Sequence, residues 1–183
     1  MKIMKKILIF FADGFEEIEA IAPYDVLKRG GVQVKYASIG DAAVSGSHGV
    51  RVETECGIDE AFDGEMIVIP GGMRGVNNIL ASEKAIELVK RYYNEGKRVA
   101  AICAGPMVLT KAGVLSGKRA VCYPGLEDRM SGNMSQDNNT VTDGAVTTSR
   151  AAGSAIDFGL RLLAELKGES EAERVRAEIH HAE

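Results

Sequence analysis

The chain has 183 residues, 45% of them hydrophobic and 26% charged, so it can bury a core without disulfide or metal crosslinks and is too apolar for general disorder. Its formal net charge of −4 disfavours binding to nucleic acid, which usually requires a basic surface. The apolar runs fall short of the roughly 20 residues that a membrane span needs, so we expect neither a membrane segment nor a secretory leader.

Short apolar runs alternate with helical patterns in the first part of the chain, which is typical of βαβ units. Continuous apolar runs and one alternating segment predict strands at 7–11, 32–38, 66–69 and 99–102. Helical spacing of apolar residues predicts helices at 16–28 and 83–94. The stretch 40–55, rich in Gly and Ser, is compatible with a small hairpin.

The second part of the chain continues the same pattern. A short helix is expected at 106–111, and two longer ones are expected at 151–167 and 169–181. Further short strands are expected at 120–121, near 141 and at 146–148, with a polar loop at 131–140. We therefore expect residues 1–183 to form one α/β domain, a three-layer sandwich with a mostly parallel sheet between helices.

The sharpest chemical signal is Cys103, which lies between an expected strand and the next helix. In open α/β sheets the functional crevice lies beyond the carboxyl ends of the strands. A nucleophile on such a tight turn needs small neighbours, which Ala101, Ala104 and Gly105 provide. The free N–H groups at the next helix start are expected to lower the pKa of the thiol. The alternative is a buried, inert cysteine, and the spacing alone does not decide between the two.

The other two cysteines, Cys56 and Cys122, have no comparable surroundings. Three cysteines cannot all pair within one chain, so we expect no disulfide framework and a reducing, cytoplasmic setting. In such a setting one thiol can be kept for its reactivity. Cys122 can be considered as a second reactive thiol, but we interpret it as structural.

Two other strand ends carry residues that can act together with the cysteine. The backbone N–H groups of Gly71 and Gly72 can form an oxyanion hole with that of Ala104, although an ordinary turn is the simpler interpretation. Glu19 follows the first strand and lies on a different helix face from the two preceding glutamates, which suit any helix start. A carboxyl that touches a thiolate shares one proton with it and can later act as an acid or a base.

Several motifs together resemble the ThiJ/PfpI superfamily, in the branch of the human Parkinson-disease protein and its bacterial relatives. The motifs are Gly14-Phe15-Glu16-Glu17-Ile18-Glu19, Pro23-Tyr24-Asp25-Val26, Val68-Ile69-Pro70-Gly71-Gly72, Ala100-Ala101-Ile102-Cys103-Ala104-Gly105-Pro106 and Thr148-Ser149-Arg150. The resemblance spans nearly the whole chain and implies a flavodoxin-like fold related to that of the class I glutamine amidotransferases. It implies that Cys103 is the reactive, oxidation-prone cysteine, that Glu19 is its protonated partner, and that Gly72 and Ala104 supply backbone donors.

The resemblance also implies a function. Family members are described as cofactor-free glyoxalases, as deglycases acting on methylglyoxal and glyoxal adducts, and as oxidative-stress sensors and chaperones. We therefore expect Cys103 and Glu19 to convert methylglyoxal to lactate or to remove glycation adducts, with no cofactor and no metal. The alternative is a non-enzymatic stress sensor or redox chaperone that works through oxidation of Cys103. Thiazole monophosphate biosynthesis is a third alternative, and only the family label supports it.

One position departs from the family pattern. Tyr123 precedes Pro124 where several relatives have a histidine. A phenol, with a pKa of about 10, is a poor proton shuttle near neutral pH but can still hydrogen-bond a substrate. Ala104 stands where the PfpI-type proteases have a histidine, which disfavours that kind of peptidase activity.

Residues at the periphery are expected to serve assembly rather than chemistry. Relatives are mostly homodimers, with the first helix and the loop near His48 at the interface, so we expect a homodimer. Asp25, His48 and Arg150 are assigned to the dimer interface or the rim of the site. The expected partners are therefore a small aldehyde or glycated substrate and a second copy of the chain, with no nucleic acid and no membrane.

Overall fold

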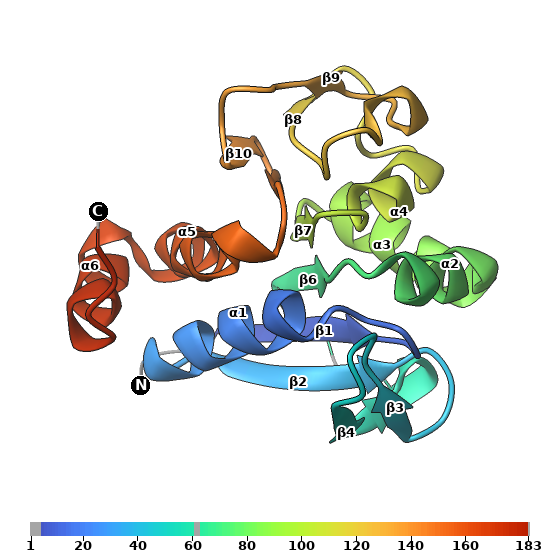
Figure 1. Ribbon diagram of the computed structural model, residues 1–183, viewed down its shortest axis with the longest axis horizontal. Coiled ribbons are helices and arrows are strands. Elements are labelled where there is room, and N and C mark those ends of the chain that lie inside the picture. The colour runs from blue at the N-terminus through green and yellow to red at the C-terminus, as the bar shows by residue number, and fades with distance from the viewer. Residues whose placement is uncertain (1–4, 61–62, 183) are drawn as a thin grey trace.

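The computed structural model describes residues 5–60 and 63–182, so residues 1–4, 61–62 and 183 of the expected 1–183 domain lie outside the description (Figure 1). In the described part, the central sheet has the strand order β10 (Thr140–Asp143), β11 (Val146–Ser149), β7 (Arg98–Ile102), β6 (Met66–Ile69), β1 (Lys6–Phe11), β2 (Gln33–Ser38) and β5 (Cys56–Gly57). Neighbouring strands pair in parallel except β10 and β11, which are antiparallel. The prediction of a mostly parallel sheet is confirmed.

Helices cover both faces of this sheet (Figure 1). One face carries α2 (Met73–Ala81), α3 (Glu83–Asn94) and α4 (Pro106–Lys111). The other carries α1 (Glu17–Arg29) and α5 (Ala155–Lys167), and α6 (Glu169–Glu178) packs on α5. The predicted three-layer α/β arrangement is therefore confirmed.

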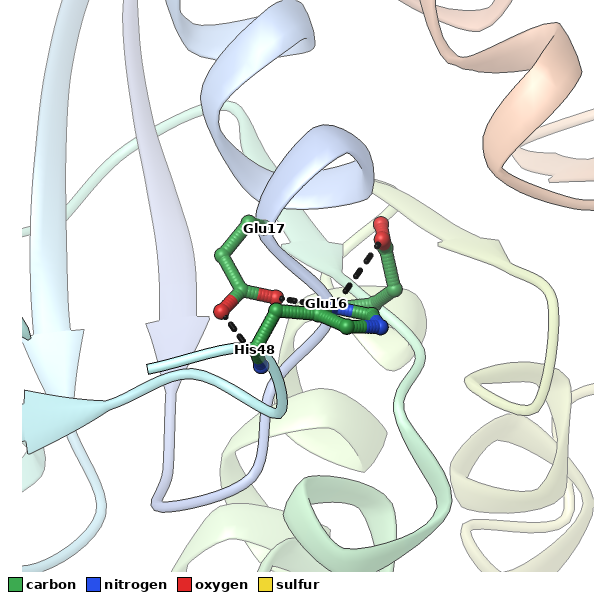
Figure 2. Close-up of side chains that lie close together, drawn as sticks. All are labelled: Glu16, Glu17 and His48. Carbon is green, nitrogen blue, oxygen red and sulfur yellow. Dashed lines mark hydrogen bonds and ion pairs between the residues drawn. The ribbon is translucent and has the colours of Figure 1, made fainter. Parts of the chain in front are cut away.

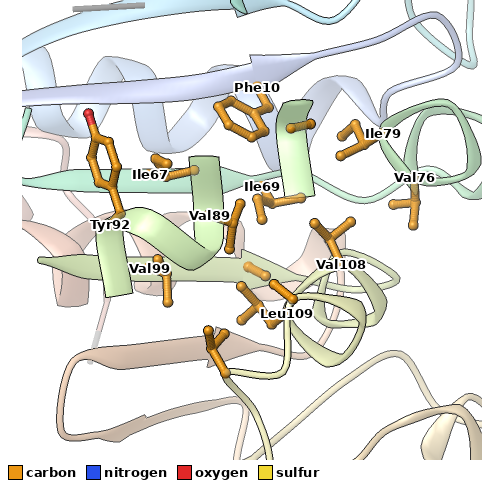
Figure 3. Close-up of a cluster of buried hydrophobic side chains, with 14 of the residues drawn as sticks. Phe10, Ile67, Ile69, Val76, Ile79, Val89, Tyr92, Val99, Val108 and Leu109 are labelled. Atoms are coloured by element: carbon orange, nitrogen blue, oxygen red, sulfur yellow. The ribbon is translucent and has the colours of Figure 1, made fainter. Parts of the chain in front are cut away.

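The two layers of core follow from the alternation of side chains along the buried strands. Leu8 and Phe10 of β1 enter the core beneath α2, α3 and α4, and Figure 3 shows Phe10 there with Val76, Val89 and Tyr92. Their neighbours in the same strand, at 7, 9 and 11, enter the core beneath α1 and α5. Because successive side chains of a strand point to opposite faces, an unbroken apolar run is what a sheet covered on both sides requires.

Several elements differ from the sequence-based expectation. Helix α2 was not expected, because its nine residues include a glycine and two asparagines, which are poor helix formers, and only Gly75, Val76 and Ile79 are buried. The helix predicted at 151–167 begins at Ala155, after a 3-10 turn at Ala152–Ser154, and the last helix ends at Glu178 rather than at 181. The remaining 3-10 turns are η1 (Ile58–Glu60) and η2 (Glu127–Arg129).

Two small strand pairs lie outside the main sheet. The hairpin predicted within 40–55 is present as β3 (Ala43–Ser45) and β4 (Arg51–Glu53). The stretch interpreted as a polar loop contains β9 (Asn133–Met134), which pairs in parallel with β8 (Arg119–Ala120). None of the helices in the described part of the chain combines the length and the hydropathy that crossing a membrane requires.

Candidate active site

Cys103 lies directly after β7 in a turn whose backbone is held on both sides. Its φ of 65° places it in the left-handed region, which is uncommon for a residue other than glycine. The Cys103 N–H donates to the carbonyl of Ser149 at 2.9 Å, and the Cys103 carbonyl accepts from the N–H of Tyr123 at 2.9 Å. Residues held in such a conformation by their surroundings concentrate at functional sites, so the turn supports a chemical role for the thiol.

The Cys103 thiol and the Glu19 carboxyl are hydrogen-bond partners. Glu19 belongs to the first turn of α1, and only 1% of its surface is exposed. The N–H of Gly71 donates to Glu19 Oε2 at 2.9 Å. A Cβ atom at Gly71 would overlap that oxygen and lie 2.7 Å from the Cβ of Cys103 and 3.0 Å from its Sγ. Position 71, two residues after β6, must therefore be glycine for the two side chains to meet.

A pocket of about 330 Å³ opens beside this pair. Its lining comes from five separate parts of the chain: Glu16, Glu19, Gly72, Met73, Cys103, Ala104, Tyr123, Leu126, Ala151, Ala152 and Gly153. Five of the residues singled out from the sequence thus meet at one cavity, whereas Gly71 is not part of its lining and contacts Glu19 instead. The N–H groups of Gly72 and Ala104 point to the Cys103 sulfur.

The N–H of Gly71 is not available for the predicted oxyanion hole, because it donates to Glu19. Asp25 lies on α1 and pairs with Arg29 at 2.7 Å, and Arg29 in turn pairs with Glu178 at 2.8 Å, so Asp25 belongs to a surface ion-pair network. The guanidinium of Arg150 donates to the carbonyl of Gln136.

His48 lies against the start of α1, as Figure 2 shows. Its Nδ1 is 2.9 Å from Glu17 Oε2, and its N–H donates to Glu17 Oε1 at 2.7 Å. Burial by itself raises the pKa of Glu17, but the hydrogen bonds from the His48 ring and backbone outweigh it and bring the pKa to about 2. The carboxylate therefore ties the loop that carries His48 to α1.

Glu16, Glu17 and His48 form the one cluster of metal-ligating side chains found among the described residues. The oxygens of Glu17 already accept hydrogen bonds from Ser47 and His48, and Glu16 Oε2 caps the helix by accepting from the Glu19 N–H at 2.8 Å. A cation would also meet the positive end of the helix dipole. These groups are thus better explained as a helix cap and a loop anchor than as metal ligands.

Comparison with known proteins identifies the family of this chain. A family model described as the DJ-1/PfpI family matches residues 5–165. The chain belongs to the DJ-1/PfpI family. This confirms the resemblance inferred from the motifs.

The relatives in this family include both DJ-1 proteins and deglycases. The chain is 36% identical over 178 residues to protein dj-1beta of Drosophila melanogaster, covering 93% of this chain and 94% of that protein. It is 40% identical over 152 residues to a deglycase of Pyrococcus abyssi, covering 81% of this chain and 91% of that one. The solved structure of Drosophila DJ-1beta matches with a TM-score of 0.95 and 33% identity over 99% of this chain and 100% of its own.

Burial dominates the electrostatics of the pair in this DJ-1/PfpI family member. It raises the pKa of Glu19 to about 7, against the hydrogen bonds from Cys103 and Gly71. Burial, together with the charge of Glu19, raises the pKa of the Cys103 thiol to about 12, against the N–H groups of Ala104 and Gly72. The expectation of a lowered thiol pKa is therefore wrong while Glu19 is ionised. The pair loses its first proton near pH 7 and keeps the second until the pH is far higher. Above pH 7 the two groups therefore share one proton.

The raised pKa of Glu19 predicts a pH-dependent stability. Glu19 is ionised in the unfolded chain above pH 4.5 but stays protonated in the folded one up to about pH 7, so stability is lost as the pH rises through this window. The loss that Glu19 contributes is about 3 kcal/mol. Denaturant unfolding of the wild type and of Glu19→Gln across this range should show it as a difference in slope. Parallel curves for the two proteins would contradict the assignment.

Sequence reasoning missed part of the pocket wall. Glu16 was interpreted as an ordinary acidic helix start, yet it lines the pocket, and its charge adds to the raised pKa of Glu19. Met73 directly follows Gly72, which is the one signal that could have identified it. Leu126 joins the pocket lining because the segment after Tyr123 turns back toward the pocket. No sequence motif marks that turn.

Proposed function

We propose that the protein is a cofactor-free enzyme that detoxifies reactive dicarbonyls, by converting methylglyoxal to lactate or by removing glycation adducts. The observation that carries this proposal is the shared-proton pair of Cys103 and Glu19 at the head of a small pocket. The naming of several relatives as deglycases supports an enzymatic role.

The proposed reaction begins when the shared proton moves from the Cys103 sulfur to Glu19, which leaves a neutral carboxyl and a thiolate. The sulfur attacks the aldehyde carbon, a C–S bond forms, and the carbonyl electrons move to the oxygen, which takes up a proton. The N–H groups of Gly72 and Ala104, which point to the sulfur, are the nearest donors for that oxygen. The proposed oxyanion hole therefore consists of the Gly72 and Ala104 N–H groups and does not include that of Gly71.

Glu19 then acts as the base. After giving up its proton, the carboxylate removes the hydrogen from the former aldehyde carbon, which gives an enediol, and returns a proton to the neighbouring carbon. The product is a thioester, which water hydrolyses to the hydroxy acid and the free thiol. Substrate and water account for all atoms, and no external oxidant or reductant is needed. In a glycated amine the former aldehyde carbon carries the amine, so its C–N bond breaks as the C–S bond to Cys103 forms. Glu19 gives its proton to the departing nitrogen, the free amine leaves, and the hemithioacetal that remains follows the same route.

A direct assay tests the proposal. The protein is incubated with methylglyoxal while lactate is measured, and in parallel with a glycated amino acid while the free amine is measured. Formation of either product above the buffer rate supports the proposal. The ratio of the lactate rate to the free-amine rate shows whether glyoxalase or deglycase action dominates. Absence of both products would overturn it.

The second candidate is a redox sensor that acts through the same sulfur. One solved relative, DJ-1 of Toxoplasma gondii, is described as oxidized, and it matches this chain with a TM-score of 0.92 and 34% identity over 98% of this chain and 100% of its own. Peroxide would convert the Cys103 thiolate to a sulfenate and release water. This candidate would be favoured if peroxide oxidised Cys103 selectively and the protein formed neither lactate from methylglyoxal nor free amine from a glycated amino acid.

Tyr123 offers a way to raise the proposed activity. It lines the pocket and is 49% exposed, so a substitution there disturbs little packing. A histidine, with a pKa of about 6.5, exchanges protons near neutral pH, and positioned acids and bases typically contribute about 10²–10⁴-fold. We expect Tyr123→His to raise kcat for lactate formation about ten-fold or more. Tyr123→Phe, which removes only the hydroxyl, should show no gain, and equal rates for the two variants would contradict a proton shuttle.

We also propose that the protein is a homodimer. Ile18 and Ile21 on α1 are 54% and 37% exposed, and Val50, close to His48 in the chain, is 46% exposed. Apolar groups of this size on one region of a surface favour a protein interface. Light scattering after size exclusion should give the mass of a dimer for the wild type and a lower mass for Ile18→Lys. Ile156→Lys, on α5, is the matched control, and a monomeric wild type would overturn the proposal.

A further inference from the structure

Apart from the reacting pair and Glu16, the lining of the pocket is almost wholly apolar. Met73, Tyr123 and Leu126 line it together with the alanines of the 151–153 turn. Met73 and Tyr123 are 40% and 49% exposed, so much of their apolar surface is free to cover a bound molecule. Burying apolar surface stabilises a complex by roughly 25 cal/mol per Å². The wall is therefore suited to a substituent that is larger than a hydrogen or a methyl group.

The charged side chains that line the pocket are all carboxyls. Among the described residues that line it, none is Lys, Arg or His, and Glu16 contributes a carboxyl at the rim. That carboxyl is held in place because it accepts the N–H of Glu19. A substrate with a carboxylate or phosphate in its tail would have no cation to pair with and would be repelled by Glu16. The pocket thus disfavours anionic tails.

The volume agrees with a small aromatic or branched substrate. About 330 Å³ lies at the lower end of the roughly 300–1,000 Å³ of pockets that hold small molecules. The aldehyde carbon must lie at the Cys103 sulfur with its hydrogen near Glu19. Since Glu19 occupies one side of the sulfur and most of the remaining lining is apolar, the other substituent meets side chains such as Met73, Tyr123 and Leu126.

We propose that this pocket selects 2-oxoaldehydes with a neutral apolar substituent, such as aryl glyoxals, over glyoxal and over oxoaldehydes with anionic tails. The proposal rests on the function proposed above and adds the substrate class. The chemistry is the same: an aryl glyoxal and one water become an aryl hydroxyacetate and a proton. The role of Met73 and Tyr123 is to bind the substituent.

The experiment compares kcat/KM for glyoxal, methylglyoxal, phenylglyoxal and 4-carboxyphenylglyoxal, with hydroxy acid as the readout. Small apolar differences in a pocket change rates by about 10–200-fold. We expect phenylglyoxal to exceed methylglyoxal by about ten-fold or more, and 4-carboxyphenylglyoxal to fall below phenylglyoxal by a similar factor. Initial rates at low concentration, with a mass measurement of the recovered protein, exclude modification of arginines by the aryl glyoxals.

Variants connect the preference to the wall. Met73→Ala should lower kcat/KM for phenylglyoxal more than for methylglyoxal, because the larger substituent makes more of the lost contact. Ile156→Ala removes an apolar side chain of similar exposure from α5, away from the pocket lining, and should change neither. Methylglyoxal turnover with equal or lower rates for phenylglyoxal would overturn this inference and leave the proposed function standing.

A separate measurement decides the inference if no oxoaldehyde is turned over, which would overturn the proposed function. Alkylation of Cys103 by iodoacetamide is followed in the presence of acetophenone or of benzoate, which share an aryl ring and differ in charge. An apolar, anion-excluding pocket predicts that acetophenone slows alkylation and that benzoate does not at the same concentration. Equal protection by both, or protection by neither, would overturn the inference.

Discussion

Replacing Cys103 by serine is expected to lower lactate formation from methylglyoxal by about three orders of magnitude or more, because removal of a nucleophile eliminates the covalent route. A serine hydroxyl cannot share a proton with Glu19 near neutral pH, since its oxygen is far less acidic than sulfur. The substitution is nearly isosteric, so the turn held by Ser149 and Tyr123 should keep its backbone hydrogen bonds. The loss should therefore appear in kcat rather than in folding.

The matched control for this prediction is Cys56→Ser. Cys56 is half-buried on the edge strand β5, and its sulfur lies 3.8 Å from the carbonyl of Tyr36, outside the pocket lining. We expect this variant to turn over methylglyoxal like the wild type. Circular dichroism of both variants checks the fold. Retention of more than about a tenth of the wild-type rate by Cys103→Ser would reject a covalent mechanism through this residue.

Replacing Gly71 by alanine is expected to disrupt the pair with both chemical groups still present. Gly71 does not have a positive φ, so the new residue causes no backbone strain and acts through its Cβ alone. That atom would overlap Glu19 Oε2 and lie 2.7 Å from the Cβ of Cys103, so the two side chains must separate. Overpacking of this kind costs about 1–3 kcal/mol of stability. We expect activity to fall by about two orders of magnitude, since a 1 Å misplacement can cost that much.

Gly153→Ala is the control for this second prediction. Gly153 lines the same pocket, but a Cβ there meets no atom within 4 Å. Activity and the midpoint of thermal unfolding are measured for both variants. The prediction requires the loss at position 71 to exceed that at 153 by at least about ten-fold. Similar losses at the two positions would show that the absence of a side chain at position 71 is not what allows Cys103 and Glu19 to meet.

Most of the fold could be predicted because its signals are local. A strand covered on both faces must be apolar at every position, and the runs at 7–11 and 66–69 show this without reference to any partner. Helix α2 could not be predicted, because its stability comes from packing of Val76 and Ile79 into the core beneath it rather than from its own helix propensity.

The candidate site, like the fold, could be predicted only where its residues leave a local pattern in the sequence. Cys103 and Glu19 were identified because a strand-to-helix turn and a helix start leave local patterns. The direction of the Gly71 N–H was not predictable, because it depends on where the Glu19 carboxyl lies, 52 positions away in the chain. The apolar wall at Met73 and Leu126 leaves no spacing signal either, since it forms only when distant loops meet.

The sequence by itself determined the alternation of strands and helices and the family pattern, and it singled out Cys103 and Glu19 as the candidate pair, because each depends on residue types at short range. The tertiary structure alone decided the electrostatics of that pair. Residues distant in the chain bury Cys103 and Glu19 together, and burial raises both pKa values, to about 12 and about 7. Desolvation is a property of the packed surroundings, so the helix-start argument for an acidic thiol failed, whereas the shared proton followed from contact between the two groups.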